Sequence, residues 1–321
     1  MPLDPHVRRF LGTLSVGGAR SAADLTVEER RASFARLLGL GGEPAPMADV
    51  GERQVPGPAG ALRVRIYSPP RAEDGPAPGL IFFHGGGLVA GSLETHDGIC
   101  RALGHASGCR ILSVDYRLAP EARFPAALED AGAATRWVIG HAEDLRLDPR
   151  RLGVAGDSAG ATLAAAVCQG LAAAGEGGIA LQVLICPILD YRAQTVSRHE
   201  FAEGFLLDQG TLEHDLRHYL DASADPGDPR ISPLKAPVLT AVPPACIHTA
   251  ECDPLRDEGR LYAERLRTAG VPVRYRCHPG MIHLFYGLGA VIPGVTEAYR
   301  TMGEDIRALC DREDDEATIR H

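Results

Sequence analysis

From residue 50 onward, short runs rich in β-branched and large apolar residues alternate with longer runs of helical periodicity. Such alternation is typical of a mostly parallel sheet with helices on both faces, because parallel strands need long crossover connections. The expected fold class is therefore α/β, with one central sheet. We predict strands at residues 62–67, 80–83, 110–115, 151–155, 181–186, 245–249 and 271–276. The helical runs lie at residues 96–107, 125–141, 159–173 and 255–269.

The N-terminal segment, residues 6–38, stands outside this alternation and carries two amphipathic helical runs. The second run begins with a capping box of Thr26 and Glu29, in which each side chain accepts a backbone N–H of the other residue. Glycines and prolines at residues 39–46 then break the chain. We predict two helices that a linker joins to the α/β domain. Closely spaced strands around residues 56–60 predict an antiparallel hairpin at the edge of its sheet.

A second irregular segment lies between Pro187 and Pro237, where the strand–helix alternation lapses. Its helical run, at residues 211–220, has no strand directly before it, so we interpret the segment as an insertion. Apolar side chains in both irregular segments are candidates for the wall of a covered pocket, or simply for packing between the segments and the core. They are Phe10, Phe34, Phe201, Phe205, Leu206 and Leu207.

Composition and charge exclude several kinds of partner. The formal net charge is −9 with both signs interspersed, so no basic stripe suited to nucleic acid is present. No run reaches the roughly 20 apolar residues that cross a bilayer, and the N-terminus lacks the pattern of a signal peptide. We therefore expect no nucleic-acid partner, no membrane span and a cytoplasmic location. An acidic cluster near the C-terminus is expected to be a solvated helix face and a frayed tail: Glu304, Asp305, Asp311, Glu313, Asp314, Asp315 and Glu316.

The sequence contains no pattern that predicts a metal or a cofactor. Its eight cysteines form no CxxC pair and no Cys/His cluster at zinc spacing. It has neither a GxGxxG fingerprint nor a Walker lysine. We therefore expect no cofactor, no metal ion and no disulfide framework.

One short motif has the context of a nucleophile elbow, in which a strand, a sharp turn and a helix follow one another. Gly156-Asp157-Ser158-Ala159-Gly160 comes after the strand at residues 151–155 and opens an Ala-rich helix. Glycine at both ends lets neighbouring backbone segments approach the turn. The amides at the start of the helix favour negative charge near the serine oxygen. A glycine-rich turn without a chemical role fits the same five residues.

A second glycine motif, His84-Gly85-Gly86-Gly87, follows the strand at residues 80–83. Three consecutive glycines leave backbone N–H groups unshielded, which is suitable for an oxyanion hole. A flexible turn or a phosphate-binding loop is the alternative. We expect His84 to anchor the loop, and we expect His96 and His105, in the next helical run, to lie at the surface.

The two motifs, in this order and each after its own strand, resemble those of the hormone-sensitive-lipase-like family of bacterial esterases (family IV). Other matching motifs extend the resemblance to nearly the whole chain. They are Gly91-Ser92-Leu93, Asp115-Tyr116-Arg117-Leu118-Ala119-Pro120-Glu121, Phe124-Pro125-Ala126-Ala127, Asp253-Pro254-Leu255-Arg256-Asp257-Glu258-Gly259 and Gly280-Met281-Ile282-His283. That family has the α/β-hydrolase fold with a helical cap and needs no cofactor.

The resemblance implies a catalytic triad in which Ser158 is the nucleophile, Asp253 the acid and His283 the base. This order along the chain agrees with the order that the fold requires. Two positions depart from the family pattern, because Ala161 and Leu284 stand where glycine is common. Both could reshape the wall of the pocket. The implied oxyanion hole consists of the backbone N–H groups of Gly85, Gly86 and Ala159.

The residues themselves leave alternatives for the triad. Asp253 precedes a proline and a helical run, so it also fits an ordinary N-cap. Glu251, in the same loop, is the alternative acid. His278 is a weaker candidate than His283 for the base, because it falls inside or at the end of a predicted strand. The Asp115–Glu121 stretch is interpreted as scaffolding beneath the site.

We expect residues 1–45 to form N-terminal cap helices and residues 46–321 to form the catalytic domain, with a cap insertion at about residues 190–225. The resemblance implies a serine carboxylesterase for esters of short to medium acyl chains, and a possible homodimer. One alternative is a receptor for small ligands, although such receptors on this scaffold have lost the catalytic histidine. Another is an amidase, deacetylase or acyltransferase with the same triad.

Overall fold

The structure is a computed structural model that describes residues 2–16, 24–70 and 75–310. Within these residues the core is an eight-stranded sheet of strand order β1-β2-β4-β3-β5-β6-β7-β8. The pairs from β4 to β8 are parallel, whereas β2 is antiparallel to both β1 and β4. The α/β class and the hairpin at the sheet edge are therefore confirmed. The strands are β1 (Asp49–Gly57), β2 (Gly60–Ser68), β3 (Ala77–Phe83), β4 (Arg110–Val114), β5 (Leu147–Asp157), β6 (Leu181–Ile185), β7 (Ala245–Cys252) and β8 (Val273–Ile282).

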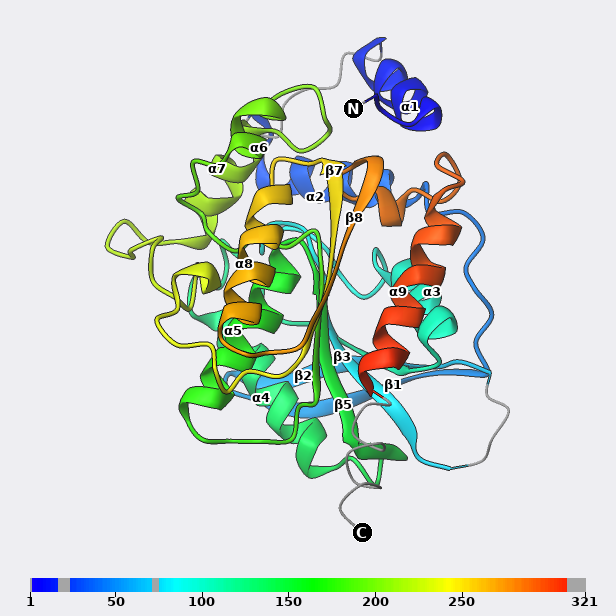
Figure 1. Cartoon of the computed structure of the whole chain (residues 1–321), viewed down its shortest axis with the longest axis vertical. Coiled ribbons are helices and arrows are strands. Elements are labelled where there is room, and N and C mark those ends of the chain that lie inside the picture. Colours follow the sequence, from blue (N-terminus) through cyan, green and yellow to red (C-terminus); the bar gives the residue numbers. More distant parts are fainter. Residues whose placement is uncertain (1, 17–23, 71–74, 311–321) are drawn as a thin grey trace.

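Helices cover both faces of this sheet, with α4, α5 and α8 on one side and α3 and α9 on the other (Figure 1). Helices α1, α2, α6 and α7 lie together at the end of the molecule where β7 and β8 finish (Figure 1). The predicted capping box of Thr26 and Glu29 opens α2. The helices are α1 (Pro5–Val16), α2 (Val27–Leu38), α3 (Asp97–Ser107), α4 (Ala126–Gly140), α5 (Ala159–Ala173), α6 (Val196–Glu200), α7 (Gln209–Tyr219), α8 (Arg256–Thr268) and α9 (Val295–Cys310).

Strand β3 shows how one apolar run fills two cores. Leu80 and Phe82 belong to the core that includes residues of α3 and α9, whereas Ile81 and Phe83 belong to the core on the α4 and α5 side. All four are fully buried. Successive side chains of a strand point to opposite faces, so a strand covered on both faces must be apolar throughout. Each buried side chain contributes about 1.5–3 kcal/mol to folding.

Helix α2 is fixed to two loops of the sheet by Arg31. Its Nε donates to the carbonyl oxygen of Val89 at 2.8 Å, and one Nη donates to that of Ala119 at 3.1 Å. The guanidinium also pairs with both carboxylate oxygens of Glu121, at 2.9 and 2.7 Å. Glu121 therefore has the scaffolding role that we expected of its motif, and it connects the N-terminal helices to the loops after β3 and β4.

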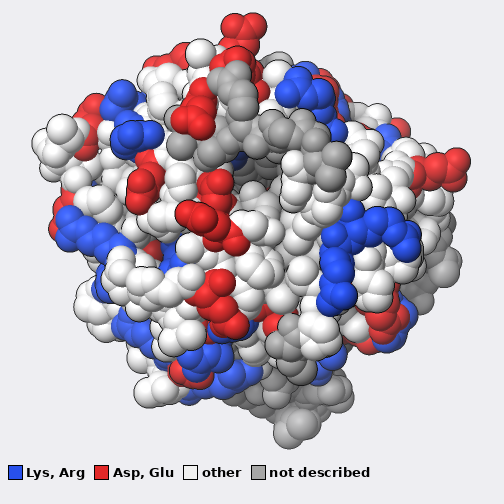
Figure 2. All heavy atoms as spheres, turned by 90° about the horizontal axis from the view of Figure 1, so that it is seen from above, with Lys and Arg blue, Asp and Glu red and all other residues white. Residues whose placement is uncertain are grey.

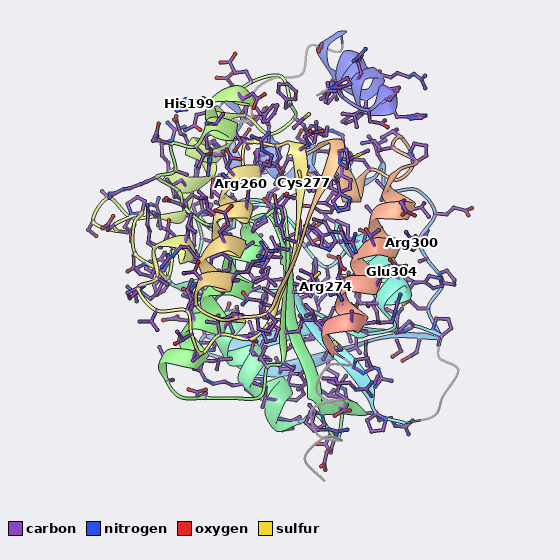
Figure 3. The ribbon with its side chains drawn as sticks, viewed as in Figure 1. His199, Arg260, Arg274, Cys277, Arg300 and Glu304 are labelled. Atoms are coloured by element: carbon purple, nitrogen blue, oxygen red, sulfur yellow. The ribbon has the colours of Figure 1, made fainter. Side chains whose placement is uncertain are left out.

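Asp305 differs from the expectation of a solvated helix face. It lies on the buried side of α9 and accepts hydrogen bonds from Arg276 and, at 3.1 Å, from Arg274. Glu304, one residue earlier, is exposed and pairs with Arg300 on the outer side of the helix (Figure 3). The two acidic neighbours face opposite environments because adjacent helical residues point about 100° apart. The acidic residues from Asp311 to Glu316 lie outside the described residues.

Two further properties of the described part of the chain concern the environment of the protein. Among these residues, no helix is both long enough and apolar enough to cross a bilayer. No disulfide joins the eight cysteines, which all lie in the described residues, and Cys277 is the exposed one among them.

Candidate active site

Ser158 stands at the sharp turn between β5 and α5. Its backbone adopts φ 53° and ψ −120°, a conformation that costs a non-glycine residue about 1–3 kcal/mol. Packing of glycine backbone holds the turn in place. A Cβ on Gly160 would lie 2.0 Å from the carbonyl oxygen of Phe83, and one on Gly156 would lie 2.4 Å from the backbone of Gly160. Both glycines are therefore required sterically, as the motif predicted.

Ser158, His283 and Asp253 form a continuous hydrogen-bonded chain. Ser158 Oγ lies 3.0 Å from His283 Nε2, and His283 Nδ1 lies 2.8 Å from Asp253 Oδ2. The three residues follow the carboxyl ends of β5, β8 and β7, respectively. In the sheet, β7 and β8 are neighbours, and β6 lies between β5 and β7. All three are buried. The fold thus brings together the three residues that the sequence singled out.

The Asp253 carboxylate is held at both oxygens. Oδ1 accepts the backbone N–H of Leu255 at 2.8 Å, while Oδ2 faces His283. Helix α8 begins at Arg256, so Asp253 is not its N-cap. Glu251 accepts the N–H of Gly280 at 2.7 Å and so braces the chain ahead of His283.

His278, the other candidate base, lies on β8 with its Nε2 2.9 Å from Nδ1 of His248. It lines a separate cavity of about 480 Å³, and Ser158 does not line that cavity. Burial and, to a smaller extent, the nearby charge of Arg276 together lower the pKa of His278 to about 4. The geometry therefore favours His283 as the partner of Ser158.

The glycine motif after β3 forms a loop beside Ser158. Gly86 and Gly87 have φ of 116° and 69°, conformations that favour glycine, and both line the same pocket as Ser158. The N–H of Gly85 is donated to Asp157 Oδ1 at 2.9 Å. This N–H is therefore already occupied, which differs from the expectation that Gly85 contributes to an oxyanion hole.

His84 anchors this loop from inside the protein, as expected. Its Nδ1 lies 2.8 Å from the carbonyl oxygen of Gly85, and its ring stacks on Tyr116 at a centroid distance of 4.4 Å. The hydroxyl of Tyr116 donates to the His84 carbonyl at 2.6 Å. Burial lowers the pKa of His84 to about 3, and His96 adds to this effect. His84 is consequently neutral at physiological pH.

Asp157 is a functional residue that the sequence reasoning missed. Its carboxylate accepts bonds from Gly85 N–H at 2.9 Å and Tyr286 Oη at 3.0 Å, and it lies 3.5 Å from His96. His96 is fully buried, so our expectation of a surface position for it was wrong. Burial raises the pKa of Asp157, but His96 and the Tyr286 hydrogen bond lower it below its usual value overall. The sequence signal that could have pointed to Asp157 is its position directly before Ser158 in the nucleophile-elbow motif.

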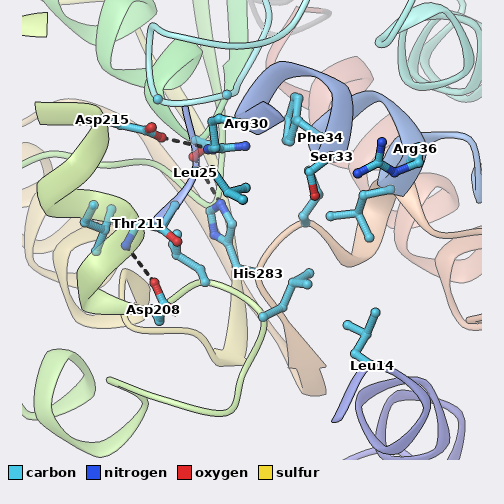
Figure 4. Close-up of a pocket in the computed structure, with 18 of the residues that line it drawn as sticks. Leu14, Leu25, Arg30, Ser33, Phe34, Arg36, Asp208, Thr211, Asp215 and His283 are labelled. Carbon is cyan, nitrogen blue, oxygen red and sulfur yellow. Dashed lines mark hydrogen bonds and ion pairs between the residues drawn. The ribbon is translucent and has the colours of Figure 1, made fainter. Parts of the chain in front are cut away.

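A cavity of about 620 Å³ opens above Ser158 and His283. Figure 2 shows the molecule from this end, where its surface is hollowed near the centre. Residues of α1, α2 and α7 and of the segment before α7 line the cavity (Figure 4). Three of the six expected wall residues, Phe34, Leu206 and Leu207, do line it. Phe10, Phe201 and Phe205 pack elsewhere against the core. The other apolar wall residues are Leu11, Leu14, Leu25, Leu37, Leu40, Ile188, Leu212 and Leu284.

Leu284, one of the positions that depart from the family pattern, adopts the left-handed conformation with φ 64°. Glycine would adopt it without strain, whereas a leucine pays a steric cost. Its side chain is buried and lines the pocket beside His283. Ala161, the other such position, is fully buried in α5. Leu284 therefore reshapes the pocket wall as we expected.

Among the residues that the structure describes, two groups of side chains have ligand atoms close enough for a metal ion. In the first, Cys186 joins Asp253 and His283. Burial raises the pKa of the Cys186 thiol well above its usual value, and the charge of Asp253 adds to this, so the thiol is a poor ligand. In the second, Cys246, His248 and Asp305, the carboxylate already pairs with two arginines. We assign neither group as a metal site.

Comparisons with known proteins identify the family to which this fold belongs. A family model described as the alpha/beta hydrolase fold matches residues 80–287. Carboxylic ester hydrolase LipN of Mycobacterium tuberculosis is 42% identical over 89% of this chain and 77% of its own length. Ethyl acetate hydrolase of Pseudomonas putida is 39% identical over 92% of this chain and 96% of its own.

Solved structures of ester hydrolases are also similar to this chain in sequence and in fold. Ester-hydrolase EH1AB1 from the metagenome of Lake Arreo superimposes with a TM-score of 0.92 at 40% identity, covering 95% of this chain and 98% of its own. The hyperthermophilic esterase of Pyrobaculum calidifontis gives 0.90 at 38% identity, covering 96% and 99%. The chain belongs to the α/β-hydrolase family, and its resemblance to the hormone-sensitive-lipase-like esterases is confirmed. It is an enzyme of the hydrolase class.

Proposed function

We propose that this protein is a serine carboxylesterase that hydrolyses esters of short to medium acyl chains through an acyl-enzyme. The observation that carries the proposal is the chain of hydrogen bonds from Asp253 through His283 to Ser158 at the base of the cavity. Nucleophile, base and orienting acid have the separations that acyl transfer by a serine requires. The names of the relatives, which are ester hydrolases and esterases, support the same reaction.

The reaction proceeds in two halves. In the first, Ser158 Oγ attacks the ester carbonyl while its proton passes to His283 Nε2, and the tetrahedral intermediate then expels the alcohol, which takes that proton. In the second, water gives a proton to His283 and its oxygen attacks the acyl-enzyme. The acid leaves and Ser158 regains its proton. Asp253 stabilises the imidazolium in both halves, because its carboxylate is bonded to Nδ1.

The oxyanion hole is proposed to consist of the N–H groups of Gly86, Gly87 and Ala159. Gly86 and Gly87 line the pocket with Ser158, and Ala159 is the first residue of α5, where helical amides lack intrahelical acceptors. Gly85 instead positions the loop, because its N–H is bonded to Asp157. Donors fixed by backbone packing stabilise the developing negative charge without reorganising during the reaction.

The helices around the cavity are proposed to form its cap. The described part of residues 1–45 and the insertion at about residues 190–225 contribute most of the apolar wall, over a catalytic domain that we place at residues 46–321. A covered cavity of about 620 Å³ accommodates a short or medium acyl chain together with a small alcohol. The homodimer and the cytoplasmic location stay predictions, of which sedimentation velocity tests the first.

A hydrolysis screen tests the proposal. We expect the purified protein to hydrolyse p-nitrophenyl esters of short acids, and we expect Ser158→Ala to abolish this activity. An amidase or deacetylase would share the acyl-enzyme but prefer amide substrates over esters of the same acid. Absence of hydrolysis of any activated ester would instead favour the receptor alternative.

A further inference from the structure

Leu284 follows the proposed base directly and has a strained backbone. Its φ of 64° and ψ of 7° are those of the left-handed conformation, in which the Cβ of an L-residue crowds a backbone carbonyl. Glycine adopts this conformation without that cost. Such strain persists only where the surrounding structure holds it, and it concentrates at functional sites. The leucine side chain is therefore a candidate for a role in the reaction.

Packing around the turn holds this leucine in place. Its carbonyl oxygen accepts the N–H of Gly287 at 2.9 Å, at the end of the short helix η3 (Phe285–Gly287). A Cβ on Gly287 would lie 3.8 Å from Leu284 Cγ and 2.5 Å from Leu38 Cδ2, so side chains of the turn and of α2 meet at this glycine. Leu284 is consequently fixed between the loop of the base and the N-terminal helices.

Leu284 also borders the space in which the substrate must bind. Ser158, His283 and Leu284 line the same cavity of about 620 Å³, and Figure 4 shows His283 at its wall. Their exposed fractions are similar, at 7%, 6% and 4%. A wall residue excludes substrate atoms by van der Waals contact and needs no more access than this. Leu284 can therefore limit the space beside the reacting groups.

The proton transfers of the proposed reaction decide which part of the substrate lies there. His283 Nε2, which is 3.0 Å from Ser158 Oγ, takes the serine proton and then gives it to the leaving alcohol. The ester oxygen must therefore come within hydrogen-bond reach of Nε2, and the first carbon of the alcohol is one bond farther. The acyl chain extends instead from the carbonyl carbon, which becomes bonded to Ser158. The residue next to the base thus borders the alcohol side.

We propose that Leu284 excludes branching at the carbon attached to the ester oxygen, so that the preferred substrates are esters of primary alcohols. A secondary alcohol carries an additional carbon at that position, which would meet the isobutyl side chain. The flat ring of a p-nitrophenyl ester has no substituent out of its plane and is not excluded on this ground. The inference rests on the proposed esterase function and adds a specificity-determining residue to it.

Three isomeric esters test the inference. Propyl butanoate is the reference, isopropyl butanoate has its branch in the alcohol, and propyl 2-methylpropanoate has its branch in the acid. The readouts are the alcohol ratio and the acyl ratio, which are kcat/KM for the respective branched ester divided by kcat/KM for the reference. Each ratio is divided by the same ratio for hydroxide, which corrects for intrinsic reactivity. Neither ratio depends on the fraction of folded enzyme.

Two variants separate the bulk of the side chain from the strain of the backbone. Leu284→Ala removes the end of the side chain but keeps a Cβ in the left-handed conformation, whereas Leu284→Gly removes both. We expect an alcohol ratio of about 0.1 or less in wild type and a rise of about tenfold in both variants, as one carbon in an apolar pocket implies. The acyl ratio should stay within twofold of wild type. Leu284→Gly should unfold at a higher urea concentration than Leu284→Ala, because glycine is unstrained there.

Leu206→Gly is the matched control. Leu206 is a leucine that lines the same cavity and also has a left-handed φ, of 75°, but it belongs to the insertion and not to the loop of the base. The control therefore reproduces both the loss of a wall leucine and the relief of strain. We expect its alcohol ratio to stay within twofold of wild type.

An alcohol ratio within twofold of wild type in both Leu284 variants would overturn the inference. So would a wild-type alcohol ratio near one, or an equal rise of the acyl ratio in the variants or of the alcohol ratio in Leu206→Gly. In each of these cases propyl butanoate is still hydrolysed in a Ser158-dependent manner, and the proposed function stands. If wild type hydrolyses none of the three esters, the proposed function fails and this inference fails with it.

Discussion

The carboxylate of Asp253 lies 2.8 Å from Nδ1 of His283, and its other oxygen accepts the Leu255 N–H at the same distance. Both oxygens are thus committed, so the carboxylate cannot rotate without breaking a buried hydrogen bond. With Nδ1 held in this way, the proton of the neutral imidazole resides on Nδ1, and Nε2 is free to accept from Ser158. Asp253 therefore sets both the orientation and the tautomer of His283, the proposed base.

This relationship separates the two acidic candidates, Asp253 directly after β7 and Glu251, which lies in β7 and not in the loop as we expected. Asp253→Asn should lower kcat by about 10³- to 10⁴-fold, because an amide stabilises neither the imidazolium nor the required tautomer. Glu251→Gln should cost less than about tenfold, since the amide oxygen can still accept the Gly280 N–H. Steady-state kinetics on p-nitrophenyl butanoate, with circular dichroism as the check on folding, measures both. The opposite ranking would transfer the acid role to Glu251.

The packing of the elbow predicts opposite effects for two glycines of the same helix. Gly160→Ala should destabilise the protein by about 2–3 kcal/mol or more and reduce kcat, because its Cβ meets the Phe83 carbonyl oxygen at 2.0 Å. Gly170→Ala, in the same helix with open space around it, should stabilise the protein by about 0.5–1 kcal/mol. Urea unfolding with an activity assay measures both effects. Equal effects at the two positions would show that the elbow does not depend on this close approach.

The paired histidines His248 and His278 predict that the protein loses stability in mild acid. Burial lowers the pKa of His248 to about 3, with a contribution from His278, and that of His278 to about 4, with a contribution from Arg276. In the unfolded chain both pKa values are about 6.5. Below that pH the unfolded state binds more protons, so the free energy of unfolding should fall as the pH drops toward 4. The limiting slope is about 1.4 kcal/mol per pH unit for each histidine.

A variant series isolates this contribution from that of the carboxylates. We expect His278→Gln to reduce the slope of the unfolding free energy against pH between about 4 and 6.5. The reduction should be at most about 1.4 kcal/mol per pH unit, which is the contribution of one proton. His105→Gln, at an exposed position of α3, is the control and should leave the slope as in wild type. Urea titrations at half-unit pH intervals provide the slopes. Identical slopes in wild type and His278→Gln would contradict burial of the neutral pair.

The size and the apolar wall of the cavity predict a limited range of acyl chains. Each methylene that is buried adds about 0.8 kcal/mol to binding until the chain reaches the far wall. We expect kcat/KM on p-nitrophenyl esters to peak between about C4 and C8 and to fall well before C16. Leu37→Trp, which enlarges a wall residue of α2, should move the peak to shorter chains. Activity that rises up to long-chain triglycerides at a lipid interface would indicate a lipase instead.

The strands, the main helices and the three residues of the proposed triad could be predicted to lie where they do because their signals are local. Each predicted strand overlaps an observed one, and Ser158 and His283 each belong to a short motif next to such a strand. Strand β8 extends to Ile282, beyond the predicted end at residue 276. His283 therefore follows the strand directly.

The contacts that the sequence did not reveal join residues that are far apart in the chain. The Gly85 N–H is bonded to Asp157, 72 residues later, and Arg30 to Asp215, 185 residues later. Nothing near Arg30 or Asp305 in the sequence distinguishes a buried charge from a solvated one, since burial depends on which helix or strand packs opposite. Such pairings become visible only when the sheet order is known.

Labelling of Ser158 tests the central claim most directly. A serine-directed phosphonate, added to the full-length protein, should modify Ser158 alone, as peptide mass spectrometry can show, and should abolish ester hydrolysis in proportion to labelling. Ser158→Ala should neither take the label nor retain activity, with kcat reduced by about 10⁴-fold or more. Full activity in a Ser158→Ala preparation free of wild-type enzyme, or a label on another residue that tracks the loss of activity, would contradict the assignment.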